Sequence, residues 1–419
     1  MNALDSAGAA MAARAEAPTE PLKRYFHGTH RTCTPEETLA RVQPFLPEIG
    51  ITRIANLTGL DRVGVPVAMA VRPNARSVSI SQGKGLTLAA AKASAVMESL
   101  EVWHAERIVK PLKLASTREM RSEHRIAEVS QLPRAAGGRY TDAVPLLWIE
   151  AEDLAGGGTA WVPFELASAN YTLPLPTGSG CFQANTNGLA SGNHWLEAVS
   201  HALCEVVERD ARTLWQRATR MQDQRVVDPE GIDDPACTSV LARIAAAGLR
   251  VRIWDITTDI GIASFACVVS GRDEDDADPE LGSGTHPVKH IALLRAITEA
   301  CQARLIYIAA ARDEYYPDLY TPAARRARRA IFGRMLEAET PRCAYAHVPS
   351  FESASIEADL RWMLARLRAA GIEQVCAVDL TREALGIAVA RVIVPGLEGA
   401  LDEAYTPGRR ALRQLRRGP

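Results

Sequence analysis

Three long helical segments carry glutamates inside stretches made otherwise of alanine, leucine and valine. The hydrophobic pattern predicts helices over residues 87–107, 194–218 and 288–311. A carboxylate on a helix face suited to burial is costly to remove from water unless something positive lies beside it. This feature constrains the fold most, because it favours an arrangement in which the three helices turn their polar stripes toward one shared site.

The polar stripes follow the periodicity of an α-helix. On the second helix an arc of roughly 120°, at about 100° per residue, holds Asn193, Glu197, Glu205 and Glu208, with Arg209 beside them. On the first helix one face carries Ser94, Glu98 and Glu101. The third helix places Arg295 and Glu299 four residues apart, with Gln302 one turn further on.

Several carboxylates converging in one cleft would repel one another and raise each other's pKa, and divalent cations would remove that cost. A ligand set of Glu, Asn and Gln oxygens, without a Cys or His cluster, suits Mg²⁺ and not zinc. Mg²⁺ in such a set usually also holds substrate phosphates, which Lys84, Arg209 and Arg295 would neutralise. A single Glu–Arg pair at this spacing is more often a solvated helix face. The three stripes together favour the metal site.

Composition excludes several other classes of protein. The 419 residues carry a net charge of −2, which gives no argument for binding nucleic acid. No apolar run is long enough to predict a membrane span. The eight cysteines are scattered without a C-x-x-C pair, which fits reduced thiols and a cytoplasmic location.

Helical and strand-like segments alternate along the chain, so we expect one large α/β unit of mixed sheets and long helices over residues 23–405. Residues 1–22 are Ala-rich and predict a disordered tail, not a signal peptide. The basic residues 406–419 predict a solvated tail, with folding over an acidic cleft as the alternative. Glycine-rich segments 176–193 and 271–287 predict loops.

Further motifs are absent or weak. The stretch "SQGKGLT" lacks both the upstream glycine and the hydroxyl residue after lysine that a P-loop requires, so a Walker-type nucleotide site is excluded. Neither an H-E-x-x-H zinc motif nor a G-x-S-x-G nucleophile elbow occurs. The short runs "GSGC" and "GSGTH" indicate little by themselves.

Taken in order, four blocks of this sequence resemble the YcaO family of ATP-dependent enzymes, over about residues 25–400. The blocks are "GTHRTCTPEETLARV" (28–42), "GKGLTLAAAKASAVMESLE" (83–101), "SGNHWLEAVSHALCEVVER" (191–209) and "THPVKHIALLRAITEACQAR" (285–304). The last three match the family patterns S-x-x-x-E-x-x-E, N-x-x-x-E with E-x-x-E-R, and R-x-x-x-E-x-x-Q. The resemblance implies a YcaO-like fold, acting as a single catalytic unit.

The resemblance also implies roles for individual residues. Metal ligands around the phosphates of ATP would be Glu98, Glu101, Glu197, Glu205, Glu208 and Glu299. Other nucleotide contacts would be Arg31, Thr38, Lys84, Ser94, Asn193, Arg209, Arg295 and Gln302. Among these, Glu98, Glu205 and Arg295 are the residues we expect to be catalytic. Arg31 and Thr38 stand where the family has lysine and serine. Val102 stands where many family members have an arginine. Arg107 is the candidate to make the contact that this arginine makes in them.

Members of this family activate a peptide backbone amide with ATP and Mg²⁺. A neighbouring Cys, Ser or Thr then yields an azoline, whereas external sulfide yields a thioamide. The chain lacks the proline-rich C-terminus of many azoline-forming relatives, and its early blocks look closest to YcaO proteins that work with a TfuA partner. The resemblance therefore favours a thioamidase with a TfuA-like protein, a sulfur donor and a precursor peptide or protein substrate. It also implies a homodimer.

Three alternatives stay open at this stage. The first is an azoline-forming cyclodehydratase acting on a precursor peptide. The second, of another class, is a non-catalytic scaffold that keeps the fold and binds a peptide for a partner enzyme. The third is a ligase resembling the ATP-grasp enzymes, for which the sequence gives no separate support.

Overall fold

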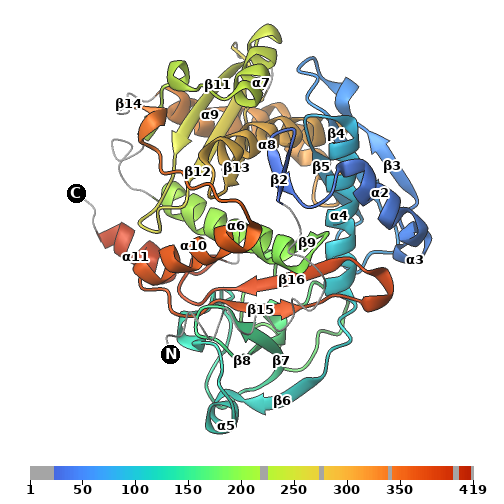
Figure 1. Ribbon diagram of the computed structural model, residues 1–419, viewed down its shortest axis with the longest axis vertical. Coiled ribbons are helices and arrows are strands. Elements are labelled where there is room, and N and C mark those ends of the chain that lie inside the picture. The colour runs from blue at the N-terminus through green and yellow to red at the C-terminus, as the bar shows by residue number, and fades with distance from the viewer. Residues whose placement is uncertain (1–22, 218–224, 273–277, 338–341, 400–404, 417–419) are drawn as a thin grey trace.

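The computed structural model describes residues 23–217, 225–272, 278–337, 342–399 and 405–416 (Figure 1). Its three main sheets are antiparallel except for one parallel pair, β10 with β14. The three-stranded sheet has the order β3 (Arg53–Asn56), β4 (Val67–Val71), β5 (Ile80–Lys84). The five-stranded sheet has the order β13 (Glu280–Thr285), β12 (Ser264–Ser270), β11 (Arg250–Asp255), β10 (Arg225–Val227), β14 (Arg342–Cys343). The expected α/β class with mixed sheets and long helices is confirmed.

The six-stranded sheet crosses the lower half of Figure 1. It runs β6 (Leu112–Ser116), β7 (Pro145–Asp153), β15 (Cys376–Asp379), β16 (Ala388–Ile393), β9 (Leu189–Gly192), and β8 (Thr159–Pro163) pairs with β7. A separate hairpin joins β1 (Arg24–Phe26) to β2 (Thr29–Arg31). The sheet thus brings together strands that are far apart in the chain, since β16 near the C-terminus lies between β15 and β9.

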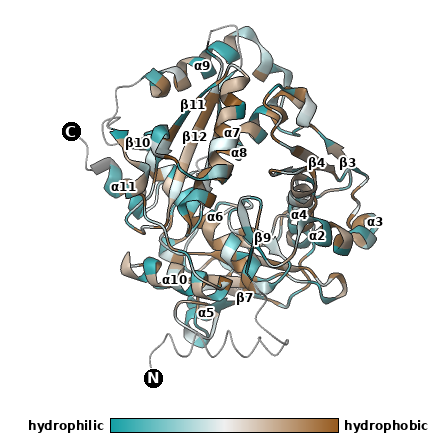
Figure 2. Cartoon of the chain, turned by 45° about the horizontal axis from the view of Figure 1, so that its top comes forward, coloured by the Kyte–Doolittle hydropathy of each residue, from teal (hydrophilic) through white to brown (hydrophobic). Residues whose placement is uncertain are grey.

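The three long helices connect these three sheets. They are α4 (Leu88–Glu106), α6 (Trp195–Gln216) and α8 (Lys289–Ala309), within a few residues of the predicted bounds. Helix α4 packs on β4 and β5 and also on β9, α6 packs on β9 and β16 and also on β13, and α8 packs on β12 and β13 and also on β5. Each helix therefore bridges two of the sheets, and the three surround one region of the molecule (Figures 1 and 2).

The shorter helices cover the outside of this frame. They are α2 (Pro35–Val42), α3 (Leu46–Ile49), α5 (Thr117–Glu123), α7 (Pro235–Ala246), α9 (Pro322–Glu337), α10 (Ile356–Ala369) and α11 (Arg409–Arg416). The predicted start of α2 is confirmed, because Thr34 and Glu37 form a reciprocal capping box ahead of Pro35. No helix of the described residues is both long enough and apolar enough to cross a membrane.

Two sequence-based predictions were wrong. The glycine-rich segments predicted as loops contain the strands β9 and β13. Residues 409–416 form a helix whose Arg410 pairs with buried Asp210 of α6 at 2.9 Å, so this basic segment is docked and not merely solvated. The predicted N-terminal tail, 1–22, lies outside the described residues.

Glycines explain how α4 and α8 approach the strands β5 and β13. A Cβ on Gly83 of β5 would lie 2.1 Å from the carbonyl oxygen of Ala91 in α4. A Cβ on Gly282 of β13 would lie 2.3 Å from the carbonyl oxygen of Ala296 in α8. Each helix thus lies directly against the strand that precedes it, at a distance that only glycine permits.

Candidate functional site

The two carboxylates of α4 are fixed by strands of different sheets. Glu98 accepts a hydrogen bond from the backbone N–H of Gln82 in β5 at 3.2 Å. Glu101 accepts from both the backbone N–H and the hydroxyl of Ser191 in β9, each at 2.7 Å. Ser94, one turn before Glu98, is exposed to solvent. Helix α4 therefore presents two glutamates at the junction of the three-stranded and six-stranded sheets.

Helix α6 contributes three glutamates along its length. Glu197, near its start, accepts from the backbone N–H and the hydroxyl of Thr32 at 3.0 and 2.8 Å, and lies 3.6 Å from Nε of Arg31. Glu205 lies 3.7 Å from Arg209, one turn on. Near the far end of this stripe, Glu208 accepts a hydrogen bond from the hydroxyl of β13 residue Ser283 at 2.9 Å.

Helix α8 closes the arrangement. Glu299 forms an ion pair with Lys84 of β5 at 3.0 Å and accepts from the backbone N–H of Ser283 at 3.3 Å. Ser283 therefore contacts carboxylates of both α6 and α8. One turn earlier, Arg295 donates to Nε2 of His201 in α6 at 2.9 Å.

Two predicted amide side chains also lie at the helix junctions. Gln302 Nε2 contacts Gln82 Oε1 at 3.5 Å, which links α8 to β5. The amide nitrogen of Asn193 donates to the hydroxyl of Thr38 in α2 at 3.0 Å, and its oxygen accepts from Arg41 at 3.1 Å. Of the predicted set, Ser94 alone is exposed; the other side chains are buried or half-buried.

The pKa values of four glutamates in the site depart strongly from the ordinary value. Burial, and repulsion from neighbouring glutamates, raise the pKa of Glu98 to about 7, that of Glu101 to about 8 and that of Glu205 to about 7. The pKa of Glu299 moves the other way: burial would raise it, yet Lys84, Arg209 and Arg212 together lower it to about 2. Burial thus makes the ionised form of the carboxylates on α4 and α6 costly, and the nearby cations do not offset that cost.

This arrangement fits Mg²⁺ and a polyphosphate. The donors are carboxylate and amide oxygens, the ligands that Mg²⁺ prefers, and a cation beside them would return the raised pKa values toward ordinary ones. Nε of Arg209 and of Arg295 are buried without a hydrogen-bond partner among the described residues, as donors kept for an anion would be. Within those residues no group of three or more His, Cys, Asp or Glu side chains is placed to hold a metal ion. A Mg²⁺ site does not need such a group, because Mg²⁺ is usually held by one or two carboxylates together with substrate phosphates.

Sequence reasoning missed the residues that hold these glutamates in place. They are Thr32, Gln82, Ser191, His201 and Ser283. Three of them, Thr32, Ser191 and His201, stand within the quoted sequence blocks, and Gln82 and Ser283 lie just before two of them. Except for His201, which is in α6, they are hydroxyl or amide residues in, or just after, a short strand that precedes a helix.

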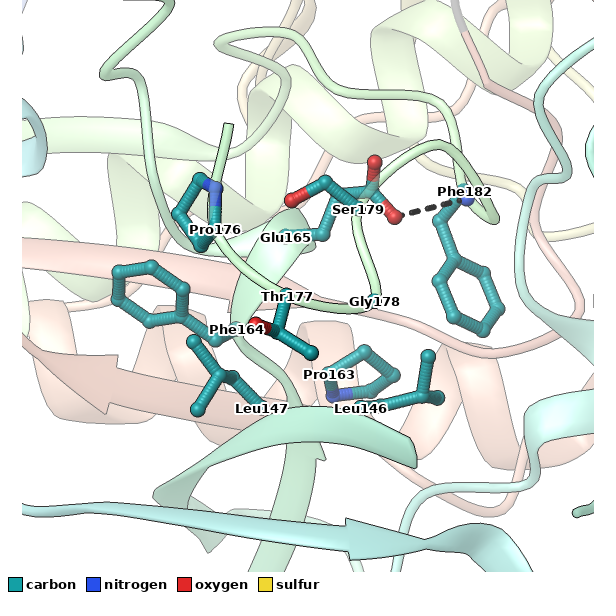
Figure 3. A pocket seen from close by; sticks show the side chains of 10 residues that line it. All are labelled: Leu146, Leu147, Pro163, Phe164, Glu165, Pro176, Thr177, Gly178, Ser179 and Phe182. Carbon is teal, nitrogen blue, oxygen red and sulfur yellow. Dashed lines mark hydrogen bonds between the residues drawn. The ribbon is translucent and has the colours of Figure 1, made fainter. Parts of the chain in front are cut away.

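A small pocket elsewhere in the molecule has a different character. It lies between β7, the end of β8 and the 176–182 loop, and it is lined mainly by apolar side chains such as Leu147, Phe164 and Phe182 (Figure 3). Its one carboxylate, Glu165, accepts hydrogen bonds from the backbone of residues 180–182. Glu165 is thus occupied in holding this loop, and none of the lining residues belongs to the glutamate cluster.

Comparison with known proteins places the geometry in context. A family model described as "YcaO cyclodehydratase, ATP- and Mg2+-binding" matches residues 82–398. An uncharacterized protein in the tfuA 3′ region of Rhizobium leguminosarum bv. trifolii is 37% identical over 92% of this chain and 93% of its own length. An uncharacterized protein of Methanothermobacter thermautotrophicus is also 37% identical, over 90% of this chain and 97% of its own length.

Solved structures share the fold. A YcaO protein of Methanopyrus kandleri, bound with AMPPCP and Mg²⁺, has a TM-score of 0.73 at 22% identity and covers 92% of this chain and 100% of its own. A heterocyclase in complex with substrate and cofactor has a TM-score of 0.77 at 23% identity; it matches 94% of this chain, which spans 55% of that longer protein.

Proposed function

Because this chain belongs to the YcaO family, whose members bind ATP and Mg²⁺, we propose that it is an enzyme that activates a peptide backbone amide and converts it into a thioamide. The observation that carries the proposal is the glutamate cluster. Carboxylates from α4, α6 and α8 gather between three sheets, with raised pKa values beside arginines that have unpaired donors.

In this proposal Glu98, Glu101, Glu197, Glu205, Glu208 and Glu299 hold Mg²⁺ against the phosphates of ATP. Lys84, Arg209 and Arg295 neutralise phosphate oxygens, and Asn193, Thr38, Arg31, Ser94 and Gln302 complete the nucleotide contacts. Lys84 is suited to its part because it lies at the end of β5, 3.0 Å from Glu299, where it can exchange that partner for a phosphate.

The bound nucleotide supplies a phosphoryl group that turns the amide oxygen into a good leaving group. With hydrosulfide as nucleophile the balance is R–CO–NH–R′ + HS⁻ + ATP⁴⁻ → R–CS–NH–R′ + ADP³⁻ + HPO₄²⁻. The C–S bond forms, the C–O bond breaks, and the amide oxygen leaves in phosphate. The residues of this chain position the reactants and offset charge as it moves between them.

The thioamide product is favoured over an azoline by genomic context in a relative. The Rhizobium protein, similar to this chain over nearly its full length, is encoded beside tfuA. On that basis we propose a TfuA-like protein and a sulfur donor as partners, and a ribosomal peptide or a protein as substrate. A cytoplasmic homodimer completes the proposal.

A second candidate, the azoline-forming cyclodehydratase, rests on the structural likeness to a heterocyclase and on the family description. The test incubates the purified protein with ATP, Mg²⁺, sulfide, a TfuA-like protein and a peptide encoded beside its gene. Exchange of O for S in the peptide mass supports the thioamidase, whereas loss of water supports the cyclodehydratase. Failure to bind Mg·AMPPCP in calorimetry would contradict both and favour a non-catalytic scaffold.

A further inference from the structure

Two arginines are almost completely buried in this fold, and they differ in their partners. Arg72 is 1% exposed and donates to both oxygens of Glu106, at 2.6 and 2.8 Å. Arg391 is 2% exposed, yet its one hydrogen bond among the described residues runs from Nη2 to the backbone oxygen of Asn185 at 2.8 Å. Its Nε and Nη1 have no partner there. A buried guanidinium without a carboxylate is costly, and a protein retains one where a ligand supplies the anion.

The register of the sheet shows which way Arg391 faces. In the pairing of β16 with β9, Val389 lies opposite Ser191 and Arg391 lies opposite Leu189. Opposite residues in an antiparallel pair share a face, and residues two apart on one strand share it too. Arg391 is therefore on the same face as Ser191, whose hydroxyl binds Glu101. Arg391 thus belongs to the sheet face that carries the contact between Ser191 and Glu101 of α4.

Its charged neighbours place Arg391 beside the glutamate cluster. The side chains whose charges reach it, within the described parts of the chain, are Glu205 and Tyr171. Arg209 lies against the same Glu205, whereas Arg31, Lys84 and Arg295 lie against Glu197, Glu299 and His201. Tyr171 is 41% exposed and borders solvent. Arg391 therefore shares Glu205 with Arg209, and its other charged neighbour, Tyr171, lies at the solvent boundary.

We infer that Arg391 binds the oxyanion on the substrate side of the site, which is the amide oxygen as it becomes phosphate. The inference rests on the proposed amide activation and adds the residue that receives the departing oxygen. Nε and Nη1 of Arg391 donate to that oxygen or to the phosphate that it joins. Negative charge therefore develops beside a buried cation that is already in place. Arg391 is then desolvated before the reaction begins.

The test uses inorganic phosphate as the probe, with the protein saturated with Mg·ADP, so that neither peptide nor sulfide is needed. Arg391→Met should weaken phosphate binding by about tenfold or more, the effect of losing charged hydrogen bonds, and leave Mg·AMPPCP affinity within about twofold. It should not lower the melting temperature, whereas the matched variant Arg72→Met should, because that change strands buried Glu106. Arg391→Lys should retain part of the phosphate affinity.

Three outcomes would overturn the inference. Phosphate affinity that is the same in wild type and Arg391→Met would remove its basis. Loss of Mg·AMPPCP affinity in that variant would make Arg391 a nucleotide ligand. Unfolding of both Arg391→Met and Arg391→Lys would make its role structural. A wild type that does not bind Mg·ADP at all would instead refute the proposed function, so the two failures are distinguishable.

Discussion

Ser191 donates two hydrogen bonds to one oxygen of Glu101, from its backbone N–H and from its hydroxyl, each at 2.7 Å. This contact joins β9 to α4 and places Glu101 beside Glu98 and Glu205. Burial and those neighbours raise the pKa of Glu101 to about 8, while Ser191 opposes the rise. The ionised form of Glu101, which a metal requires, thus depends partly on Ser191.

Ser191→Ala should therefore weaken binding of Mg·AMPPCP at pH 7 by about tenfold, since a hydrogen bond to a charged group is lost. The loss raises the pKa of Glu101 further, so the difference from wild type should narrow toward pH 9. Calorimetry at the two pH values measures both effects. Ser99→Ala is the control, because Ser99 lies buried on the same helix with no partner for its hydroxyl within the described chain. If the difference in Mg·AMPPCP affinity between wild type and Ser191→Ala does not change with pH, this account is contradicted.

The free protein should lose stability as pH rises from 6.5 to 8. The pKa values of Glu98, Glu101 and Glu205 are raised from 4.5 to about 7, 8 and 7, so the folded state holds more protons than the unfolded state in this window. Stability falls with pH wherever the folded state binds more protons. Burial lowers the pKa of His30, His104, His201 and His286. In the unfolded state these groups titrate near 6.5, so their opposing contribution is largest at the lower end of this window and fades toward pH 8.

Binding of Mg·AMPPCP should make the stability depend less on pH between 6.5 and 8, because the bound metal displaces the protons from Glu98, Glu101 and Glu205. Melting temperatures at pH 6.5 and 8, with and without the complex, measure it. Glu280, whose pKa burial also raises to about 7, lies outside the cluster beside Arg328 and should leave a small residual slope. A free protein whose melting temperature rises steadily from pH 6.5 to 8 would show that the glutamates are not perturbed as described.

Glu205→Gln should abolish ATP-dependent turnover while the protein stays folded. The amide is a poorer ligand for Mg²⁺ than a carboxylate, and the substitution removes repulsion with Glu208, so stability at pH 8 should be unchanged or higher. ATP hydrolysis and urea unfolding provide the two measurements. Glu280→Gln is the matched control, since it removes a buried carboxylate of similarly raised pKa outside the cluster. If Glu205→Gln keeps full activity, Glu205 is not a metal ligand.

The long helices could be predicted because their signals are local. Thr34 and Glu37 mark the start of α2, and the bounds of α4, α6 and α8 follow from apolar periodicity. The strands β9 and β13 could not be predicted, because glycine and serine have low strand propensity and resemble loop sequence. Their conformation is fixed by packing against helices that follow them in the chain.

The glutamates of the site could be recognised from helical spacing, whereas their partners could not. Arg391 stands about 200 residues after α6 begins at Trp195, and nothing local distinguishes it from the other arginines of the chain. Its position depends on the register between β16 and β9, which forms only when the C-terminal part of the chain enters the six-stranded sheet. Contacts of this kind require the tertiary structure.

The close approach of β5 to α4 leads to a final prediction, for Gly83→Ala. The added methyl group would lie 2.1 Å from the carbonyl oxygen of Ala91 and 2.2 Å from the backbone nitrogen of Ala95, so strand and helix must separate. We expect a loss of about 2 kcal/mol or more in the free energy of unfolding, measured by urea denaturation. Gly59→Ala is the control, because nothing lies within 4 Å of its Cβ position and its effect should be within about 0.5 kcal/mol.

Gly83→Ala should also damage the site itself. Its neighbours in β5 are Gln82, whose backbone N–H binds Glu98, and Lys84, which pairs with Glu299. Separation of β5 from α4 moves both contacts, so Mg·AMPPCP affinity should fall together with stability, whereas Gly59→Ala should change neither. Gly83→Ala with wild-type stability would show that α4 can shift without cost. Unchanged nucleotide affinity in a destabilised variant would show that β5 does not position the glutamate cluster.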